Sequence, residues 1–188
     1  MKRLILLRHA KSSWDAPVSR DFDRPLSKRG HKAGKVMGRY LKAEKISWDV
    51  ALVSPAARTL ATVDRLELGY GAPCYALEDE RLYMASTHQL LYIVRAFDDM
   101  FRSALVIGHN PGIQSLVLSL LPDTQETTRE RGRIDAKYPT AALTIIDFTV
   151  NHWADIAAHA ATLDRFVKPR DLKHDARTAG VEEHSHGQ

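Results

Sequence analysis

Histidine and arginine side chains follow three separate apolar runs of this chain. The segments are Leu7-Arg8-His9, Val53-Ser54-Pro55-Ala56-Ala57-Arg58 and Ile107-Gly108-His109. Two arginines and two histidines gathered at one point suit a dianionic phosphoryl group, because a guanidinium donates paired hydrogen bonds to phosphoryl oxygens. A histidine can also attack phosphorus and hold it covalently. The pattern therefore predicts phosphoryl-group chemistry, although a lone histidine after a strand is more often structural.

The three segments can meet only if the apolar runs before them are neighbouring parallel strands. The runs at 3–7, 49–53 and 104–107 have the length and composition of buried strands, with a weaker strand at 74–77. Ligands bind beyond the carboxyl ends of strands in open α/β sheets, so parallel strands would bring the histidines and arginines to one edge.

Helical segments alternate with these strands, which predicts an α/β sheet with helices on both faces. The expected helices are 28–44, one that begins at Pro55 and closes near Gly69 and Gly71, 86–101 and 113–121. Ser27, Ser54 and either Ser86 or Thr87 are the expected N-caps. The segments 140–148 and 153–159 are expected to pair as a hairpin joined near Asn151. The stretches 11–25 and 123–137 are expected to be loops, and the second to be mobile.

The composition indicates an ordinary soluble globular domain. Of 188 residues, 44% are hydrophobic and 27% are charged, and no apolar run approaches the ~20 residues of a membrane helix. We expect one catalytic domain over residues 1–170 and a polar, flexible tail over 171–188. A single cysteine, Cys74, excludes an internal disulfide and a zinc site built from cysteines. With no secretory signal at its start, the chain is expected to be cytoplasmic and not to bind a membrane.

A net charge of +4 is compatible with an anionic ligand or simply with a solvated surface. Aromatic residues make up 7% of the chain, and the closest basic cluster, 129–133, also contains Glu130. A nucleic-acid-binding surface would combine clustered cations with exposed aromatics, so we expect no nucleic-acid partner.

The three segments in which histidine or arginine follows an apolar run each resemble, together with their flanking residues, a motif of the histidine phosphatase superfamily, the phosphoglycerate-mutase-like proteins. Leu7-Arg8-His9-Ala10 resembles its Arg-His-Gly signature, with alanine in place of glycine; 54–59 resembles the second-arginine motif and 108–110 the second-histidine motif. The segments 23–30 (DRPLSKRG) and 137–140 (KYPT) are most similar to the SixA-type phosphohistidine phosphatases. The resemblance covers at least residues 1–148.

This resemblance implies a three-layer α/β sandwich with a mostly parallel central sheet and no metal or other cofactor. His9 would be the nucleophile, Arg8 and Arg58 would hold the phosphoryl oxygens, and His109 would donate a hydrogen bond to the transferring group. Arg24 would add a third positive contact or form a structural salt bridge.

The general acid is the least determined member of the predicted site. Glu80 resembles the acidic position of the mutase-like proteins, but it is equally compatible with a solvated carboxylate. Asp21 and Asp23 are interpreted as loop residues near Arg20 and Arg24. Trp14, Trp48 and Trp153 are interpreted as packing residues, and Cys74 as a small buried hydrophobic side chain.

The leading hypothesis is a metal-independent phosphatase that acts on phosphohistidine through a covalent intermediate on His9. One alternative is a broad small-molecule phosphomonoesterase of the same superfamily. Another, from a different class, is a non-catalytic phosphate-binding module, against which the presence of both His9 and His109 argues. The expected partner is a phosphorylated protein or a small phosphorylated substrate, and the sequence does not determine the oligomeric state.

Overall fold

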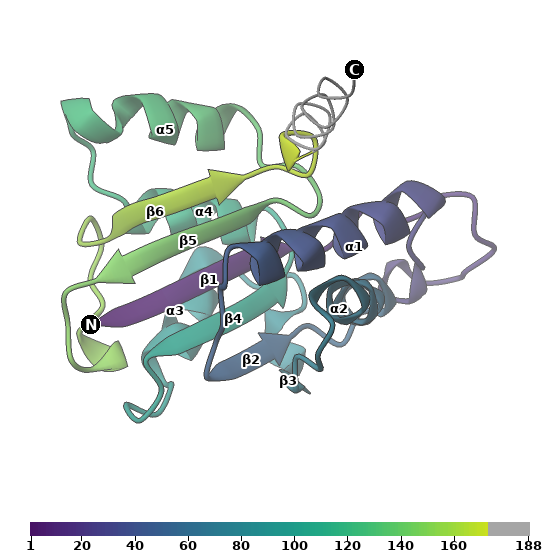
Figure 1. Ribbon diagram of the computed structural model, residues 1–188, viewed down its shortest axis with the longest axis horizontal. Coiled ribbons are helices and arrows are strands. Elements are labelled where there is room, and N and C mark those ends of the chain that lie inside the picture. The colour runs from purple at the N-terminus through teal and green to yellow at the C-terminus, as the bar shows by residue number, and fades with distance from the viewer. Residues whose placement is uncertain (173–188) are drawn as a thin grey trace, which may run out of the picture.

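One mixed β-sheet organises the chain in the computed structural model, which describes residues 1–172 (Figure 1). Its strands are β1 (Lys2–Arg8), β2 (Val50–Val53), β3 (Ala76–Glu78), β4 (Ser103–Gly108), β5 (Leu143–Phe148) and β6 (Thr162–Val167). The helices are α1 (Lys28–Ala43), α2 (Ala57–Tyr70), α3 (Thr87–Arg95), α4 (Gly112–Leu120) and α5 (Gln125–Ala136).

The sheet has the order β3-β2-β4-β1-β5-β6, and its first four strands are parallel. β5 runs antiparallel to both β1 and β6. The carboxyl ends of β1, β2 and β4 therefore reach the same edge of the sheet, as Figure 1 shows. The predicted α/β fold with a mostly parallel central sheet is confirmed.

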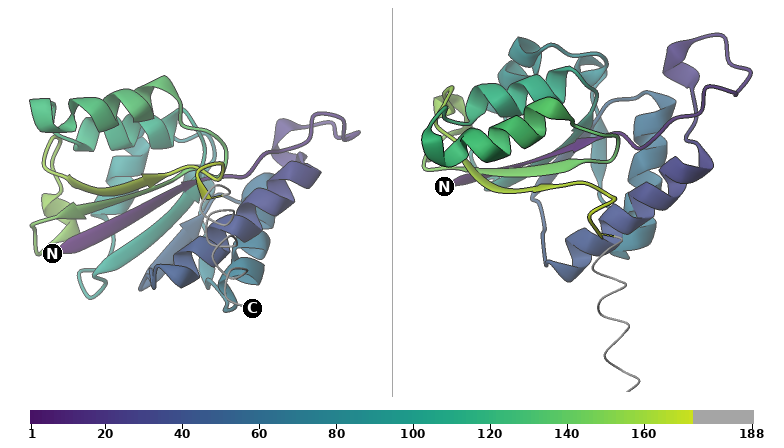
Figure 2. Two further views of the ribbon diagram at one scale, coloured as in Figure 1. Left: turned by 45° about the horizontal axis from the view of Figure 1, so that its top comes forward. Right: turned by 90° about the horizontal axis from the view of Figure 1, so that it is seen from above.

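Both faces of the sheet are covered, because alternate side chains of a strand point to opposite sides. In β1, Leu4 and Leu6 join the core on one face, and Ile5 and Leu7 join the core on the other. All four side chains are fully buried. Figure 2 shows α4 and α5 on one side of the sheet and α1 on the other. The continuous apolar run of β1 therefore reflects a strand that is buried twice.

Local sequence signals set the start of two helices as predicted. The Ser27 side chain accepts a hydrogen bond from the Gly30 amide at the start of α1. Ser86 and Gln89 form a capping box at the start of α3. α1 and α2 pack closely, and a Cβ at Gly38 would collide with the Leu66 carbonyl. Glycine at this position therefore lets the two helices approach.

Two predictions for the second half of the chain are wrong. The segment 123–137, expected to be a mobile loop, contains α5. The last strand is not 153–159 but β6, and Trp153–Asp155 forms a 3-10 turn between the two final strands. The reason in both cases is tertiary contact: Ile134 and Trp153 are fully buried in the core on the α3–α4 face of the sheet.

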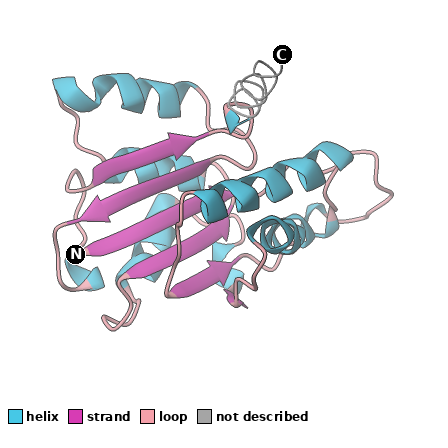
Figure 3. Cartoon of the chain, in the orientation of Figure 1, coloured by secondary structure: helices cyan, strands magenta, loops and turns pink. Residues whose placement is uncertain are grey.

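The predicted loop after β1 extends beyond the sheet edge before α1 begins (Figure 3). It contains a short 3-10 turn, Asp21–Asp23. Elsewhere, Cys74 is buried as predicted. No helix within residues 1–172 has the length and apolar character to cross a membrane. Of the predicted tail, 173–188 lie outside the described residues, so the tail and the domain limit at 170 stay predictions.

Candidate active site

The three predicted segments meet at the carboxyl edge of the sheet. β1 and β4 are paired so that Arg8 lies opposite Gly108, and the His9 amide donates to the Gly108 carbonyl (2.9 Å). The rings of His9 and His109 are 5.1 Å apart between centroids. Arg58 reaches the same point from the first turn of α2, with a side chain that is almost fully buried. The structure thus brings together the four residues that the sequence indicated most strongly.

The His9 ring is held in one tautomer. Its Nδ1 lies 2.7 Å from the Ala10 carbonyl oxygen, which can only accept, so Nδ1 carries the proton and Nε2 keeps a free electron pair. Burial lowers the pKa of His9 to about 4, and the charges of Arg58, Arg8 and Arg24 act in the same direction. At neutral pH the ring is therefore uncharged, and its Nε2 electron pair is available for attack on an electrophile.

His109 is also neutral at physiological pH. Burial lowers its pKa to about 3, with further lowering from His9 and Arg58. Its Nε2 lies 2.8 Å from the Ser54 hydroxyl, while its Nδ1 is buried without a hydrogen-bond partner in residues 1–172. If Ser54 donates to Nε2, Nδ1 carries the proton and can donate to a phosphoryl oxygen. Ser54 therefore orients His109, and its predicted role as a helix N-cap is wrong because α2 begins later, with Ala56 at the cap.

Arg8 and Arg58, the two arginines predicted to bind the phosphoryl oxygens, each keep an N–H donor free. Arg8 gives one N–H to the Tyr138 carbonyl (2.6 Å), and Arg58 donates to the Asp21 carbonyl (2.7 Å) and its carboxylate (3.0 Å). The Nε atoms of both arginines are buried without a partner among the described residues. Buried donors of this kind are normally paired, which marks the space beside them as a site for an acceptor.

Asp21 enters the site, contrary to its interpretation as an ordinary loop residue. Its carboxylate contacts Arg58 and lies 2.8 Å from Arg24 Nε, and the Tyr83 hydroxyl donates to it (3.2 Å). Partial burial raises the pKa of Asp21, but Arg58 and Arg24 outweigh it and lower the pKa overall. The sequence did contain a signal for the contact with Arg24: Asp21 lies three residues before it, within one turn of the loop, so the two side chains can pair.

Arg24 therefore forms the salt bridge that the sequence left open, and it remains near enough to lower the pKa of His9. Its guanidinium stacks on Trp14 at 3.5 Å, and Trp14 is 75% exposed. Trp14 is thus not the packing residue that was predicted. A phosphate contact by Arg24 stays a prediction.

Sequence reasoning did not identify Tyr83, which lies at this site. Its ring is 5.4 Å from the His109 ring, edge to face, and 5.8 Å from the Arg58 guanidinium. Tyr83 directly follows the 3-10 turn Glu80–Leu82 and caps its end. Glu80 itself is exposed and makes no side-chain hydrogen bond with the described residues, so its role as the acid stays a prediction.

The lowered histidine pKa values should be visible by NMR. We expect the His9 and His109 rings of the ligand-free protein to stay neutral well below pH 6, and inorganic phosphate to raise both pKa values, because a dianion favours imidazolium. The unfolded chain takes up these protons near pH 6.5, so the free energy of unfolding should fall as the pH drops from 6.5 toward 4. Ring-proton titration, assigned with single histidine variants, checks this; midpoints near 6.5 would contradict it.

Asp21 occupies hydrogen-bond donors that a phosphoryl group would need. Replacing Asp21 with asparagine removes this competing negative charge, so we expect inorganic phosphate to inhibit turnover at roughly 10-fold lower concentration. Asp23→Asn is the matched control, because Asp23 lies in the same turn and pairs with Arg20 instead. Weaker phosphate inhibition in Asp21→Asn would instead mean that Asp21 chiefly positions Arg58.

Comparisons with known proteins agree with this geometry. Residues 4–82 match the family model of the histidine phosphatase superfamily (branch 1). The chain is 32% identical to the uncharacterized protein MT1313 of Mycobacterium tuberculosis, over 87% of this chain and 100% of the relative. It is 28% identical to phosphohistidine phosphatase SixA of Escherichia coli, over 64% of this chain and 74% of the relative.

The fold is shared with solved structures of the same group. A structure from Nakamurella multipartitia, provisionally named phosphohistidine phosphatase SixA, superposes with a TM-score of 0.73 at 26% identity. The superposition covers 89% of this chain and 96% of that chain. With its family-model match, relatives and fold in agreement, this chain belongs to the histidine phosphatase superfamily, in its SixA-type branch, and is a phosphatase.

Proposed function

We propose that this protein removes phosphoryl groups from phosphohistidine through a covalent phosphohistidine intermediate on His9. The observation that carries the proposal is the hydrogen bond from His9 Nδ1 to the Ala10 carbonyl, which leaves Nε2 as a free nucleophile beside Arg8, Arg58 and His109. The substrate would be a phosphorylated protein or a small phosphorylated molecule, encountered in the cytoplasm.

The reaction proceeds in two transfers. In the first, the Nε2 electron pair of His9 forms a bond to phosphorus while the bond from phosphorus to the leaving imidazole breaks, and that imidazole takes a proton from solvent. In the second, water attacks phospho-His9, the P–N bond breaks, and the products are inorganic phosphate and free His9. Arg8 and Arg58 supply positive charge to the three non-bridging oxygens without a metal, and neutral His109 donates its Nδ1 proton to one of them in a hydrogen bond.

The phosphohistidine substrate is supported by the leaving group that the site can serve. An imidazole leaves more readily than an alkoxide, so cleavage of phosphohistidine needs less help from a protein acid. Asp21, the carboxylate nearest the arginines, has a lowered pKa and is ionised at neutral pH, which makes it a poor proton donor. The relationship to SixA of Escherichia coli, by its name a phosphohistidine phosphatase, supports the same substrate.

The test compares phosphate release from a phosphohistidine peptide and from p-nitrophenyl phosphate, with and without a metal chelator. We expect a higher kcat/KM on the peptide and no effect of the chelator. A preference for the ester would favour the broad phosphomonoesterase. Phosphate binding with zero turnover on both substrates would favour a non-catalytic phosphate-binding module.

Glu80→Gln separates the possible roles of the remaining candidate acid. If Glu80 protonates the leaving group, the variant should lose much more kcat/KM on an alkyl phosphate ester than on phosphohistidine, because the alkoxide depends on a proton. Glu78→Gln is the matched control, a nearby exposed carboxylate at the end of β3. Equal negligible losses on both substrates would identify Glu80 as a solvated carboxylate, and equal large losses would contradict an ester-selective role.

A further inference from the structure

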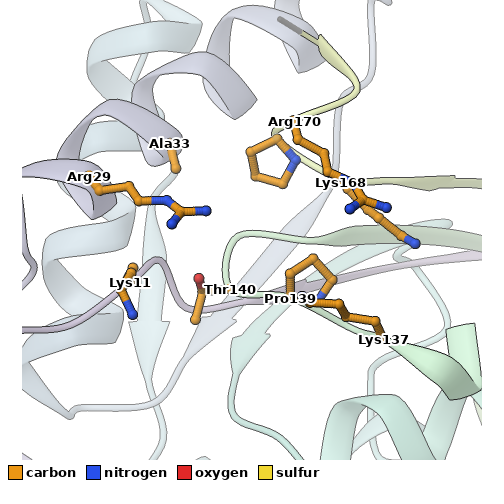
Figure 4. A pocket seen from close by; sticks show the side chains of 9 residues that line it. Lys11, Arg29, Ala33, Lys137, Pro139, Thr140, Lys168 and Arg170 are labelled. Carbon is orange, nitrogen blue, oxygen red and sulfur yellow. The ribbon is translucent and has the colours of Figure 1, made fainter.

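A cavity lined by basic residues lies beside the segment that follows His9. It has a volume of about 120 Å³ and is shown in Figure 4. Four segments form its wall: the loop after His9, the first turns of α1, the loop before β5 and the segment after β6. The lining residues are Lys11, Arg29, Ala33, Lys137, Pro139, Thr140, Lys168, Pro169 and Arg170. We call this cavity the basic pocket.

The basic pocket concentrates positive charge with little compensation. Five of its lining side chains are lysine or arginine, and none of the nine carries a carboxylate. Within residues 1–172, Arg170 alone among these five forms an ion pair, with Asp171 at 3.5 Å. Glu130, which acts on Lys168 from further away, is already paired with Arg133 at 2.8 Å. Like charges held this close repel one another, and a bound anion would relieve the repulsion.

Lys168 distinguishes this cavity from a surface patch of mobile lysines. The residue is 5% exposed, and its ammonium lies 4.9 Å from the centre of the Phe166 ring. Burial lowers its pKa and the charges of Arg170 and Arg133 lower it further, while Asp171 and Glu130 oppose this shift without cancelling it. The aliphatic stem of Lys168 is buried, which fixes the ammonium at the cavity wall, so an anion bound there would not have to immobilise a freely moving side chain.

The basic pocket shares backbone with the active site. Lys11 follows His9 by two residues, and its carbonyl accepts from both the amide (2.9 Å) and the hydroxyl (3.0 Å) of Ser27. Thr140 precedes Ala141, whose amide donates to the carbonyls of Arg8 (3.1 Å) and His9 (3.0 Å). A ligand that contacts Lys11 and Thr140 would therefore contact both segments that hold the nucleophile in place.

The size and donors of the basic pocket suit a tetrahedral oxyanion. Its 120 Å³ far exceeds the ~15 Å³ that one water needs, and a phosphate has only five heavy atoms. Arg29 and Arg170 offer paired N–H donors, and Lys168 offers a compact charge. The Thr140 hydroxyl adds a neutral donor.

We propose that the basic pocket is a second anion-binding site, distinct from the phosphoryl site at His9, that takes a phosphate group. This group is either free in solution or a second phosphate of the molecule that reacts at His9. Phosphate binding in the basic pocket does not depend on turnover. Only the assignment of that phosphate to the reacting molecule rests on the proposed function.

Binding of inorganic phosphate, followed by amide NMR shifts of the full chain, tests the site. In the wild type we expect the amide signals of Thr140, Lys168 and Arg170 to shift together as phosphate is added, and this titration gives one dissociation constant. The amide signal of Gly108 reports binding at the His9 site and should give a different dissociation constant. Arg29→Met and Lys168→Met should each weaken the first process at least 10-fold and leave the second unchanged. Arg39→Met is the matched control, because Arg39 is an exposed arginine elsewhere on α1 and should alter neither.

The proposal is overturned if the pocket amides do not move, or if their shifts disappear in Arg58→Ala, which removes a group of the His9 site. Arg29 is exposed, so Arg29→Met decides the matter even if Lys168→Met fails to fold. An equal loss of affinity in Arg39→Met would also overturn it, because the effect would then be general surface charge.

Kinetics then identify the source of the phosphate. The kcat/KM ratio between a bisphosphorylated substrate and its monophosphate counterpart should fall about 10-fold in Lys168→Met if the pocket holds a second substrate phosphate. An unchanged ratio, with phosphate binding in the basic pocket retained by the wild type, supports a free anion. If phosphate binds in the basic pocket but the protein turns over no phosphorylated substrate, the anion-binding site is supported and the proposed function is contradicted.

Discussion

Replacing His9 with alanine is expected to lower kcat/KM by at least ~10⁴-fold, about 5.4 kcal/mol of transition-state stabilisation. The variant loses the atom that the proposed mechanism uses to form the covalent intermediate, the Nε2 that the contact of Nδ1 with the Ala10 carbonyl leaves unprotonated. Arg8, Arg58 and His109 remain, so phosphate binding should persist while turnover stops. Measuring both quantities separates loss of the nucleophile from loss of the site.

His88→Ala is the matched control, because His88 is an exposed histidine on α3. It should retain full activity, and circular dichroism should show that both variants fold. During turnover of the wild type, rapid quenching should trap an acid-labile phosphoryl group on His9. Trapped phosphate on any other residue would refute the assignment of His9 as nucleophile.

Replacing Arg58 with lysine is expected to lower kcat/KM at least ~10-fold, about 1.4 kcal/mol, although the charge is kept. The Arg58 guanidinium has a planar fork that can donate two parallel hydrogen bonds to a phosphoryl group, and an ammonium lacks this fork. Arg58→Ala should lose more, roughly 10²–10³-fold, the usual cost of removing one preorganised donor from a transition-state site.

Arg65→Lys is the matched control for Arg58→Lys. Arg65 lies on the same helix about two turns further along, roughly 10 Å along its axis. Its variant should keep wild-type kcat/KM. Near wild-type activity of Arg58→Lys would rule out the bidentate contact, and would leave Arg58 as a source of charge alone.

The structure confirms the predicted buried strands and the predicted positions of the residues that follow them. A run such as Leu4–Leu7 has too few residues for a helix and too many apolar ones for a surface strand, so its place in the sheet centre follows from composition. Once three such runs are parallel neighbours, the positions of His9, Arg58 and His109 at one edge follow from strand direction. The N-cap at Ser27 is equally local.

Predictions that depended on contacts between distant segments are wrong or incomplete. The polar sequence of α5 shows no apolar face, yet Ile134 is fully buried and Arg131 donates to the carbonyls of Leu118 and Leu121 at the end of α4. Neither contact can be inferred from the helix sequence alone. Asp21 was missed for the same reason, because its partner Arg58 lies 37 residues away along the chain.

The sequence by itself determined which side chains gather at the carboxyl edge of the sheet, because strand length, apolar composition and the residue after each strand are local properties. Tertiary structure alone decided the state of those side chains. Burial beside three arginines makes His9 neutral, Ser54 becomes an orienting partner of His109 instead of a helix cap, and Asp21 enters the arginine cluster. These outcomes depend on distances between segments far apart in the chain, and electrostatic energy and hydrogen bonding are set by distance in space, not by position in sequence.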